Sequence, residues 1–386
     1  MKEIRIGIIG TGIIAHQHAE KYNSIPGVKI VAACDILEKK LNSFCDKHGI
    51  QHRYVDYREL LKRDDLDAID VCLHNNLHMP MTVKVLDAGF HCYCEKPMAG
   101  TYADAAMMAQ RAEETGKKLN IQLATLYTQQ IHCAKQIIDD GHLGKVYHGR
   151  SYGYRRRGRP FVDGYGEKEF VSAYWAAGGA LYDMGVYHIS SMLYLMDVPK
   201  LKSVSGQIYQ ELDMNEQRRK ESGFNVEELG CGFVKFDGGV TMDIFESWAI
   251  NAGEFPPSMI AGSKGGLSVR PSHHEPNEAL MYYTEMSGYP TAATIDVRAE
   301  RYRMRKIDPA IEVYDNQQTE WIAALRGDCP WPKTVNIALN TMLISEGIFM
   351  SSKLGREVTH DEIVSNSRSL ALTTQETPFG VLNYVE

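Results

Sequence analysis

The sequence predicts a two-domain protein: a doubly wound parallel sheet with covering helices over residues 1–123, then an α+β domain over residues 124–386 built on one large, mostly antiparallel open sheet. Three observations predict this class. The chain has 386 residues, more than the roughly 250–300 at which single cores stop growing. Apolar strands alternate with helical segments through the first third, which is typical of a parallel sheet. After residue 125 the pattern changes to spaced strands with glycine-rich turns.

The first third contains the expected parallel sheet. Short apolar runs predict its strands, and glycines such as Gly89 and Gly116 end its helices because they adopt the left-handed conformation easily. The expected strands cover residues 4–9, 29–34, 52–55, 68–73, 91–94 and 119–123. A helix is expected after the first strand, and the later helices cover residues 37–48, 56–61, 80–88 and a stretch through 110–114.

The remainder of the chain is expected to form the antiparallel sheet and its helices. The turn Asp237-Gly238-Gly239 between two apolar runs indicates a β-hairpin. The expected strands cover residues 146–154, 204–209, 231–236, 240–245 and 258–262. The expected helices cover residues 133–140, 180–195, 320–326 and 338–354, and the charged segment 213–224 is either a helix or a loop.

The junction between the first strand and the first helix carries a glycine fingerprint. Gly10-Thr11-Gly12-Ile13-Ile14-Ala15 has the form G-x-G-x-x-A. Gly10 permits a tight turn, Gly12 lets the backbone approach a pyrophosphate, and Ala15 lets the helix pack against its strand. The helix N-terminus, with Ile13 and Ile14 in its first turn, offers N–H groups and a positive dipole end to phosphates. The segment predicts a bound dinucleotide and hence hydride-transfer chemistry.

An acidic residue in the expected place indicates which dinucleotide is bound. Asp35 ends the second strand about 20 residues beyond the glycines, where a carboxylate bonds the ribose hydroxyls of the adenosine half and repels a 2′-phosphate. Ile36 follows it, where NADP-binding chains often have Arg or Ser. NAD is therefore favoured, although Lys39 and Lys40 keep NADP open as an alternative.

Composition and charge argue against several partners. The net charge is −7 and no basic, aromatic-rich stripe occurs, so nucleic acid is not an expected partner. The basic run at residues 155–159 is either a solvated loop or a rim that attracts an acidic substrate or the cofactor phosphates. No secretory signal pattern and no apolar run of membrane-spanning length is found. The scattered cysteines match neither a disulfide framework nor a metal site, so a cytoplasmic, metal-free protein is expected.

Glu95-Lys96-Pro97 follows a strand of the nucleotide-binding sheet. Ligands of open α/β sheets bind outside the carboxyl ends of the strands, so Lys96 is expected to project into the cofactor crevice. Its ammonium could stabilise an alkoxide that develops when a substrate hydroxyl loses its proton. A surface lysine followed by a turn proline is the alternative interpretation, and a cis bond before Pro97 is possible.

A second chemistry-bearing segment runs from Gly178 to His188. Two glycines precede an apolar helix, on which Asp183 and Tyr187 are spaced i, i+4 and share a face. His188 lies one step round the helix. A carboxylate beside a histidine can hold its tautomer and raise its basicity, which suits a general base for an alcohol proton. A polar core helix is the alternative.

Together these motifs resemble the Gfo/Idh/MocA oxidoreductase family, over essentially the whole chain. The resemblance rests on the glycine fingerprint, Asp35, the Asn75-x-x-His78 element, Glu95-Lys96-Pro97 and the segment 178–185, in this order. It implies a Rossmann domain followed by a sheet domain whose open face often forms homodimers or homotetramers. It also implies bound NAD or NADP and a sugar, glycoside or polyol substrate.

The resemblance assigns roles to individual residues. Gly10, Gly12 and Asp35 would hold the adenosine diphosphate. Asn75, His78, Glu95 and Lys96 would flank the nicotinamide ribose, and Lys96 and Asp183 would belong to the catalytic group. Leu73-His74-Asn75 and Thr125-Leu126-Tyr127 depart from the usual family residues, and Tyr187 stands where many members have histidine.

These observations predict an NAD-dependent oxidoreductase that moves hydride between a secondary hydroxyl of a sugar, glycoside or polyol and nicotinamide. Tyr187 or His188 would take the hydroxyl proton, Lys96 would stabilise the oxyanion, and Asp183 would orient the base. Tyr154, Trp175 and Trp248 could stack on a sugar ring, although core packing is the commoner fate of tryptophan. Two alternatives stay open: an enzyme that oxidises, eliminates and re-reduces a glycoside with no net NAD turnover, and a non-catalytic sensor of NAD or sugar.

Overall fold

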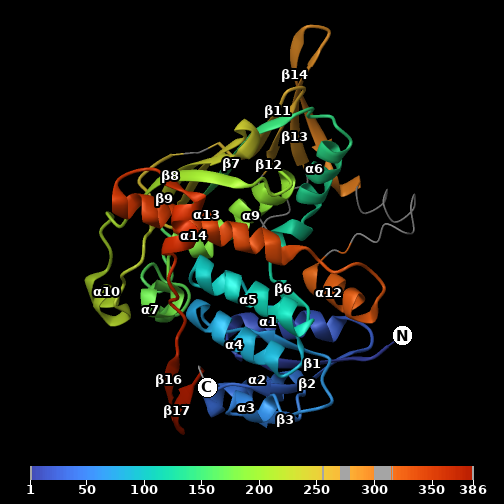
Figure 1. Cartoon of the computed structure of the whole chain (residues 1–386), viewed down its shortest axis with the longest axis vertical. Helices are drawn as coiled ribbons and strands as arrows, with labels where there is room; N and C mark the ends of the chain where they lie inside the picture. Colours follow the sequence, from blue (N-terminus) through green and yellow to red (C-terminus); the bar gives the residue numbers. More distant parts are fainter. Residues whose placement is uncertain (1, 254–255, 270–278, 300–313, 315, 385–386) are drawn as a thin grey trace. The chain divides into compact units, whose positions relative to one another are not determined.

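The computed structural model describes residues 2–253, 256–269, 279–299, 314 and 316–384 (Figure 1). The chain divides into two compact units. The first consists of residues 1–122, 317–335 and 368–386, and the second of residues 123–316 and 336–367. Two late segments therefore belong with the first unit, whereas the expected division at 123/124 assigns them to the second domain.

The first unit contains a six-stranded parallel sheet in the order β3-β2-β1-β4-β5-β6, which confirms the doubly wound class. The order reverses between β1 and β4, the switch point at which such sheets bind ligands. The strands are β1 (Ile4–Ile9), β2 (Val28–Cys34), β3 (His52–Tyr54), β4 (Ala68–Val71), β5 (His91–Cys94) and β6 (Leu119–Ile121).

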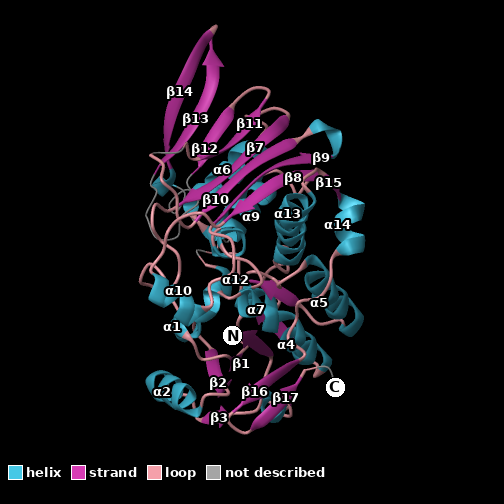
Figure 2. Ribbon diagram, turned by 90° about the vertical axis from the view of Figure 1, so that its left-hand side faces the viewer, coloured by secondary structure: helices cyan, strands magenta, loops and turns pink. Residues whose placement is uncertain are grey.

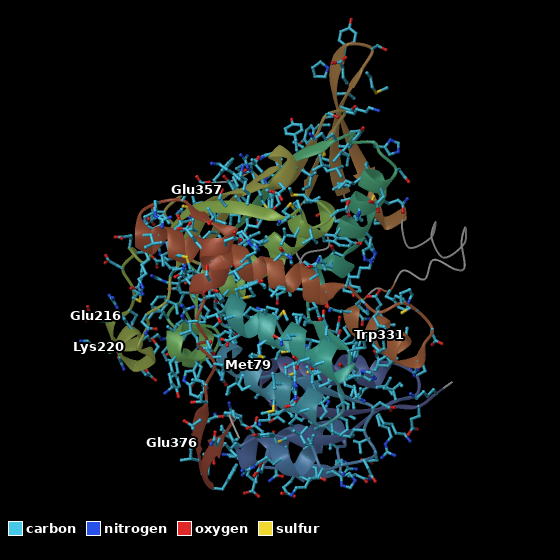
Figure 3. All side chains as sticks on the ribbon, in the orientation of Figure 1. Met79, Glu216, Lys220, Trp331, Glu357 and Glu376 are labelled. Atoms are coloured by element: carbon cyan, nitrogen blue, oxygen red, sulfur yellow. The ribbon has the colours of Figure 1, made fainter. Side chains whose placement is uncertain are left out.

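Five helices alternate with these strands, and the described late segments add α12 and a small hairpin. They are α1 (Ile13–Ser24), α2 (Glu38–His48), α3 (Tyr57–Leu60), α4 (Asn75–Asp87), α5 (Tyr102–Thr115), α12 (Gln317–Arg326), β16 (Thr374–Thr377) and β17 (Gly380–Asn383). The core of the unit includes β1, α1 and α2 side chains, and Trp321 of α12 is fully buried within it. Trp331, labelled in Figure 3, packs against Trp321 with ring centroids 5.5 Å apart.

Helix α4 begins five residues before the expected start at Pro80. A proline inside a helix donates no N–H to the carbonyl four residues earlier, which here belongs to Asn76. The backbone N–H of Leu372, in the last segment of the chain, donates to this carbonyl at 2.9 Å. A long-range contact thus satisfies the group that Pro80 cannot, which local sequence could not reveal.

The second unit is built on a nine-stranded sheet in the order β14-β13-β12-β11-β7-β10-β9-β8-β15. Neighbours β7 and β10 are parallel and the other ladders are antiparallel, which confirms a mostly antiparallel sheet. The strands are β7 (Val146–Tyr154), β8 (Leu201–Tyr209), β9 (Leu229–Phe236), β10 (Thr241–Ser247), β11 (Ser258–Gly262), β12 (Gly266–Val269), β13 (Ala279–Met286), β14 (Tyr289–Asp296) and β15 (Val358–Thr359). The sequence did not indicate β12 to β15.

Helices α9 and α13 lie on one face of this sheet (Figure 2). Glycines in the strands allow the approach: a Cβ on Gly149 would lie 2.6 Å from Met196 Sδ, and one on Gly232 would lie 2.9 Å from Ile348 Cγ1. The helices of the unit are α6 (Gln129–Asp139), α7 (Ala173–Ala176), α8 (Ala180–Asp183), α9 (Gly185–Leu195), α10 (Glu216–Ser222), α13 (Thr334–Leu354, its first two residues in the first unit) and α14 (His360–Asn366). Short 3-10 turns cover Ala124–Tyr127, Lys168–Val171, Asp237–Gly239 and Val297–Ala299.

Two expected elements of this unit take a more definite form. The charged segment 213–224 contains the helix α10, whose exposed Glu216 and Lys220 form an ion pair of 3.4 Å across one turn (Figure 3). The single helix expected over residues 180–195 is instead two helices joined at Met184. Throughout the described part of the chain, every helix is too short or too polar to cross a lipid bilayer.

Candidate active site

The glycine turn of the first unit has the shape that a dinucleotide requires. Gly10 has a φ of +93°, and a Cβ there would lie 2.2 Å from the Cys72 carbonyl oxygen, so the position admits only glycine. Gly12 caps α1 without a side-chain hydrogen bond, and a Cβ there would have open space around it. The start of α1 therefore presents its first N–H groups beside an open position, which fits a pyrophosphate.

The Asp35 carboxylate is fixed beside this turn. Its Oδ2 accepts hydrogen bonds from the backbone N–H and the hydroxyl of Thr11, both at 2.9 Å, and its Oδ1 accepts one from the Leu37 N–H at 2.9 Å. These contacts tie the end of β2 to the glycine turn. A carboxylate held in this place is suited to receive ribose hydroxyls.

The residues expected near the nicotinamide lie after β4 and β5. Asn75 is the first residue of α4 and is half-buried. His78 is fully buried, with Nδ1 2.7 Å from the Pro97 carbonyl oxygen and Nε2 3.0 Å from that of Leu73. Burial lowers the pKa of His78. The ring braces the two loops, and a direct contact with a bound ribose stays a prediction.

Glu95 is supported by a buried cluster that no sequence motif indicated. His18 of α1 lies between two carboxylates, with Nδ1 2.8 Å from Asp70 Oδ2 and Nε2 2.9 Å from Glu95 Oε1. Glu95 Oε2 accepts the backbone N–H of Lys96 at 2.9 Å, and the Lys96–Pro97 bond is cis. The one available signal was Asp70, a charged residue within an otherwise apolar strand.

Two pKa shifts follow from this arrangement. Burial disfavours the charged form of His18, but the adjacent Asp70 carboxylate outweighs burial and holds the His18 pKa well above 6.5. Burial likewise opposes ionisation of Glu95, but the His18 hydrogen bond and charge outweigh it and lower the Glu95 pKa. An imidazolium between carboxylates is the consistent charge state.

In the second unit, Glu227 organises the glycine pair before α8. Its Oε2 accepts the Gly179 N–H at 2.7 Å and its Oε1 accepts the Leu181 N–H at 2.9 Å. A Cβ on Gly179 would lie 2.0 Å from the Glu227 carbonyl oxygen, so the close approach requires glycine. Burial raises the pKa of Glu227 to about 7, although the two backbone donors oppose the rise.

Asp183, at the end of α8, accepts a hydrogen bond from the Trp248 indole, Nε1 to Oδ2 3.1 Å. Trp248 is fully buried and packs in a core cluster, so it is a packing residue and the stacking role considered for it was wrong. Tyr187 lies in the first turn of α9 and is half-buried. Its carbonyl oxygen accepts the hydroxyls of Thr125 and Ser191 at 3.1 and 2.7 Å.

The carboxylate on His188 comes from Glu246 of β10. Glu246 Oε2 lies 2.8 Å from His188 Nδ1, and Ser151 donates to Oε1 at 3.1 Å. The ring lies against the strand because residue 153 is glycine, whose added Cβ would lie 2.1 Å from His188 Cε1. Glu246 is fully buried, and burial raises its pKa although His188 opposes the rise. Sequence analysis missed Glu246, which is 58 residues from His188.

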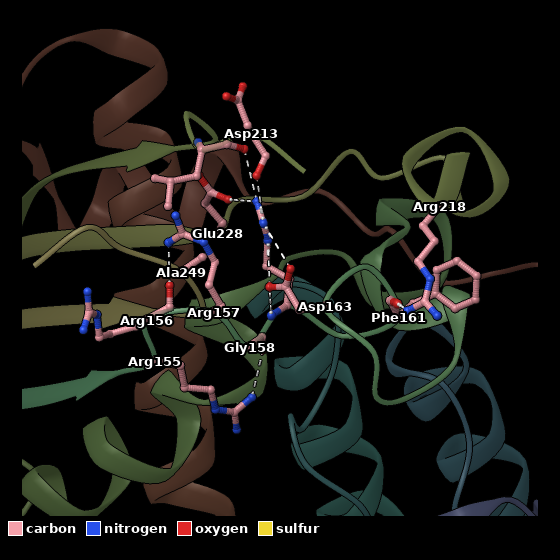
Figure 4. A network of polar contacts seen from close by, with 12 residues as sticks. Arg155, Arg156, Arg157, Gly158, Phe161, Asp163, Asp213, Arg218, Glu228 and Ala249 are labelled. Carbon is pink, nitrogen blue, oxygen red and sulfur yellow. Dashed lines mark hydrogen bonds and ion pairs between the residues drawn. The ribbon is translucent and has the colours of Figure 1, made fainter. Parts of the chain in front are cut away.

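One residue of the basic run 155–159 is buried. Figure 4 shows this region, with Arg155, Asp163 and Glu228 among the labelled residues. Arg159 is 1% exposed and pairs with Asp163 Oδ2 at 3.0 Å and Glu228 Oε2 at 2.9 Å. It also donates to the carbonyl oxygens of Leu212 and Asp213. Arg159 is thus a core ion-pair residue, and expecting it in a solvated loop or at a substrate rim was wrong.

The chain matches two family models over most of its length. Residues 4–123 match the oxidoreductase family with an NAD-binding Rossmann fold, and residues 131–268 match the GFO/IDH/MocA C-terminal domain. The protein therefore belongs to the GFO/IDH/MocA oxidoreductase family and carries an NAD-binding Rossmann domain.

Individual relatives are named for sugars and polyols. The chain is 27% identical over 278 residues to the D-glucoside 3-dehydrogenase of Escherichia coli strain K12, covering 70% of this chain and 78% of the relative. It is 32% identical over 154 residues to the inositol 2-dehydrogenase of Salmonella typhimurium strain LT2, covering 39% and 46%. A solved levoglucosan dehydrogenase complex with NADH superposes with a TM-score of 0.76 at 16% identity, covering 93% and 99%. That last likeness shows the fold alone.

Proposed function

We propose that this protein is an NAD-dependent dehydrogenase that oxidises a secondary hydroxyl of a sugar, glycoside or polyol. The observation that carries the proposal is the His188–Glu246–Ser151 arrangement in a chain with an NAD-binding domain. A carboxylate on one ring nitrogen sets the tautomer and raises the basicity of the other, as a general base for an alcohol requires. The names of the relatives favour sugar-like alcohols.

The first unit supplies the cofactor contacts. Backbone groups of Gly10, Gly12, Ile13 and Ile14 would hold the pyrophosphate, and the fixed Asp35 carboxylate would hold the adenosine ribose. Asn75, His78 and Glu95 would flank the nicotinamide ribose. When bound, NAD supplies the hydride acceptor. Because Asp35 would repel a 2′-phosphate, we propose NAD in preference to NADP.

The proton is moved by residues of this chain. Tyr187 or His188 accepts the hydroxyl proton; if His188 does so, Nε2 is the accepting atom, because Nδ1 faces Glu246. The Lys96 ammonium stabilises the developing alkoxide. Asp183, which accepts a hydrogen bond from the Trp248 indole, holds substrate hydroxyls and orients the base.

The test is a spectroscopic assay with a panel of glucosides, aldoses and inositols. The proposal expects absorbance at about 340 nm to rise as NADH forms, at a higher rate with NAD than with NADP. Release of aglycone without NADH would identify the redox-neutral glycoside-cleaving alternative. Cofactor binding with neither reaction would instead indicate a sensor. A Lys96→Ala variant with full turnover would remove Lys96 from its assigned role.

Two further expectations stay predictions. A homodimer or homotetramer is expected, and light scattering of the purified protein would measure its mass. A cytoplasmic location is likewise expected from the sequence.

A further inference from the structure

A chain of three buried side chains leads from the middle of β4 to the backbone of Lys96. Asp70 contacts His18 at 2.8 Å, His18 contacts Glu95 at 2.9 Å, and Glu95 accepts the Lys96 N–H at 2.9 Å. Each carboxylate engages a different nitrogen of one imidazole. The conformation at Lys96 is thereby tied to α1 and β4, elements that carry the glycine turn and the switch point of the sheet.

The cluster lies out of contact with water. His18 is 1% exposed, Asp70 0% and Glu95 5%. Buried carboxylates are costly unless a positive charge and hydrogen bonds compensate them. Here the compensating charge is on His18. Removing His18 would take away the hydrogen-bond partner of Glu95, and removing Asp70 would take away the carboxylate that holds the other nitrogen of His18.

The neighbouring groups do not replace His18 as the positive charge. Cys72 Sγ lies 3.5 Å from His18 Nδ1, and burial raises the pKa of its thiol to about 12, so it stays neutral. Burial raises the pKa of Tyr22, so its hydroxyl stays neutral, and the Tyr93 ring lies edge-on to His18. The charge of Lys96 also acts on Glu95.

A metal ion is a weaker interpretation of the same residues. His18, Asp70 and Cys72 offer ligand atoms within 4.8 Å of one another. However, His18 and Asp70 are already at hydrogen-bond distance, and the other nitrogen of His18 holds Glu95. The two N–H protons of an imidazolium satisfy both contacts.

We propose that Asp70 and His18 are positioning residues for Lys96. They act through Glu95, because they hold the Glu95 carboxylate where it accepts the Lys96 backbone N–H. The claim about catalysis rests on the proposed dehydrogenase function. The claim about the Lys96 backbone does not, because it concerns contacts in the cofactor-free protein.

The test uses Asp70→Asn, which keeps the size of the side chain and an oxygen acceptor but removes the charge. His16→Gln is the matched control, because His16 lies on the same helix and pairs with His48 at 2.8 Å instead. In cofactor-free protein, hydrogen exchange of the Lys96 amide should accelerate about tenfold in Asp70→Asn and stay unchanged in His16→Gln. ¹⁵N spectra should show His18 as imidazolium at pH 7 in the unsubstituted protein and as neutral imidazole in Asp70→Asn.

In the assay, Asp70→Asn should lower kcat about tenfold to a hundredfold while KM for NAD changes little, as expected for a misplaced catalytic group. In a Glu95→Gln background the Asp70→Asn change should have almost no further effect, because both act through one carboxylate. Additive losses would assign Asp70 a merely structural role and overturn the proposal.

Two readouts separate the possible failures. If no sugar is oxidised, the proposed function fails, but unchanged Lys96 exchange in Asp70→Asn would overturn the positioning claim independently. If Asp70→Asn does not fold, the ¹⁵N spectrum of the unsubstituted protein decides: a neutral His18 at pH 7 overturns the proposal, and an imidazolium supports it. Stoichiometric zinc bound with loss of the imidazolium signal would overturn it in favour of a metal site.

Discussion

Each unit buries a histidine against a carboxylate, but the two arrangements have opposite electrostatics. His18 is fully buried between two carboxylates, and the pKa of Glu95 is lowered as a result. The His188 side chain is 14% exposed and pairs with the Glu246 carboxylate, whose pKa is raised by burial. The first arrangement suits a fixed ion cluster that supports a loop. The second suits a base that exchanges a proton, and the difference lies in access to water and in the direction in which the pKa of the paired carboxylate is shifted.

The largest expected effect is on turnover, from the second unit. Whichever of Tyr187 and His188 accepts the proton, its replacement by Phe or Gln should lower kcat about 10²- to 10⁴-fold. A fall in kcat in His188→Gln, together with loss of the acidic limb of the pH–rate profile, would identify the imidazole as the base. A fall in kcat in Tyr187→Phe alone would identify the phenol. Full activity in both variants would contradict the assignment of the base to α9.

The next effect is on stability, from the first unit. His18→Leu removes the imidazolium that pairs with both Asp70 and Glu95, and it should lower the free energy of unfolding by about 3–5 kcal/mol. Guanidinium unfolding measures it, with His16→Leu on the same helix as the control. A loss no larger than in the control would show that His18 is not the compensating charge.

The pH dependence of stability should differ in sign between the carboxylates of the two clusters, Glu95 and Glu246. His18, with its pKa above 6.5, stabilises fully below about pH 6.5, and this contribution is lost as the pH rises through its folded pKa. Glu95, with its pKa below 4.5, contributes above about pH 4.5 and loses its contribution on acidification. Glu246, with its pKa raised, lowers stability as the pH rises above about 4.5.

Denaturant unfolding at several pH values shows whether the free energy of unfolding rises or falls with pH in each variant. The deficit of Asp70→Asn relative to the unsubstituted protein should be greatest at about pH 5–6.5 and smaller in alkali. Glu246→Gln should gain relative stability as the pH rises from about 4 to 7. Parallel curves for all three proteins would show that neither cluster titrates differently on folding.

The smallest effect is expected at Glu227, whose carboxylate accepts the backbone N–H groups of Gly179 and Leu181. Glu227→Gln keeps one oxygen acceptor for the Gly179 and Leu181 N–H groups and removes a buried charge, so the two changes oppose each other. Stability at pH 8 should change by about 1 kcal/mol or less. Because burial raises the pKa of Glu227 to about 7, the stability of the unsubstituted protein should fall as the pH rises from about 4.5 towards 7, and this slope should be weaker in Glu227→Gln.

The predictable parts of the fold were those set by local patterns. The parallel strands, the Gly89 and Gly116 helix ends and the β9–β10 hairpin all follow from periodicity and turn residues. The start of α4 was missed because the carbonyl opposite Pro80 is satisfied by Leu372. Strands β13 and β14 were missed because their side chains are largely exposed and lack apolar alternation.

The candidate site likewise contains residues that could be predicted from the sequence and residues that could not. The glycine turn and Asp35 could be predicted because a dinucleotide requires glycines and an acidic residue at this spacing. The carboxylates that hold His18, Leu181 and His188 lie 52, 46 and 58 residues from their partners, so no sequence pattern connects them.

By itself, the sequence determined the two sheet types, the nucleotide-binding turn and the identities of the residues that could carry a proton or a charge. Only the tertiary structure decided which carboxylate accompanies which histidine, and that Arg159 and Trp248 are buried. The physical reason is that a sequence pattern involves neighbours along the chain. The charge state of a side chain depends instead on its burial and on partners that folding brings from distant strands.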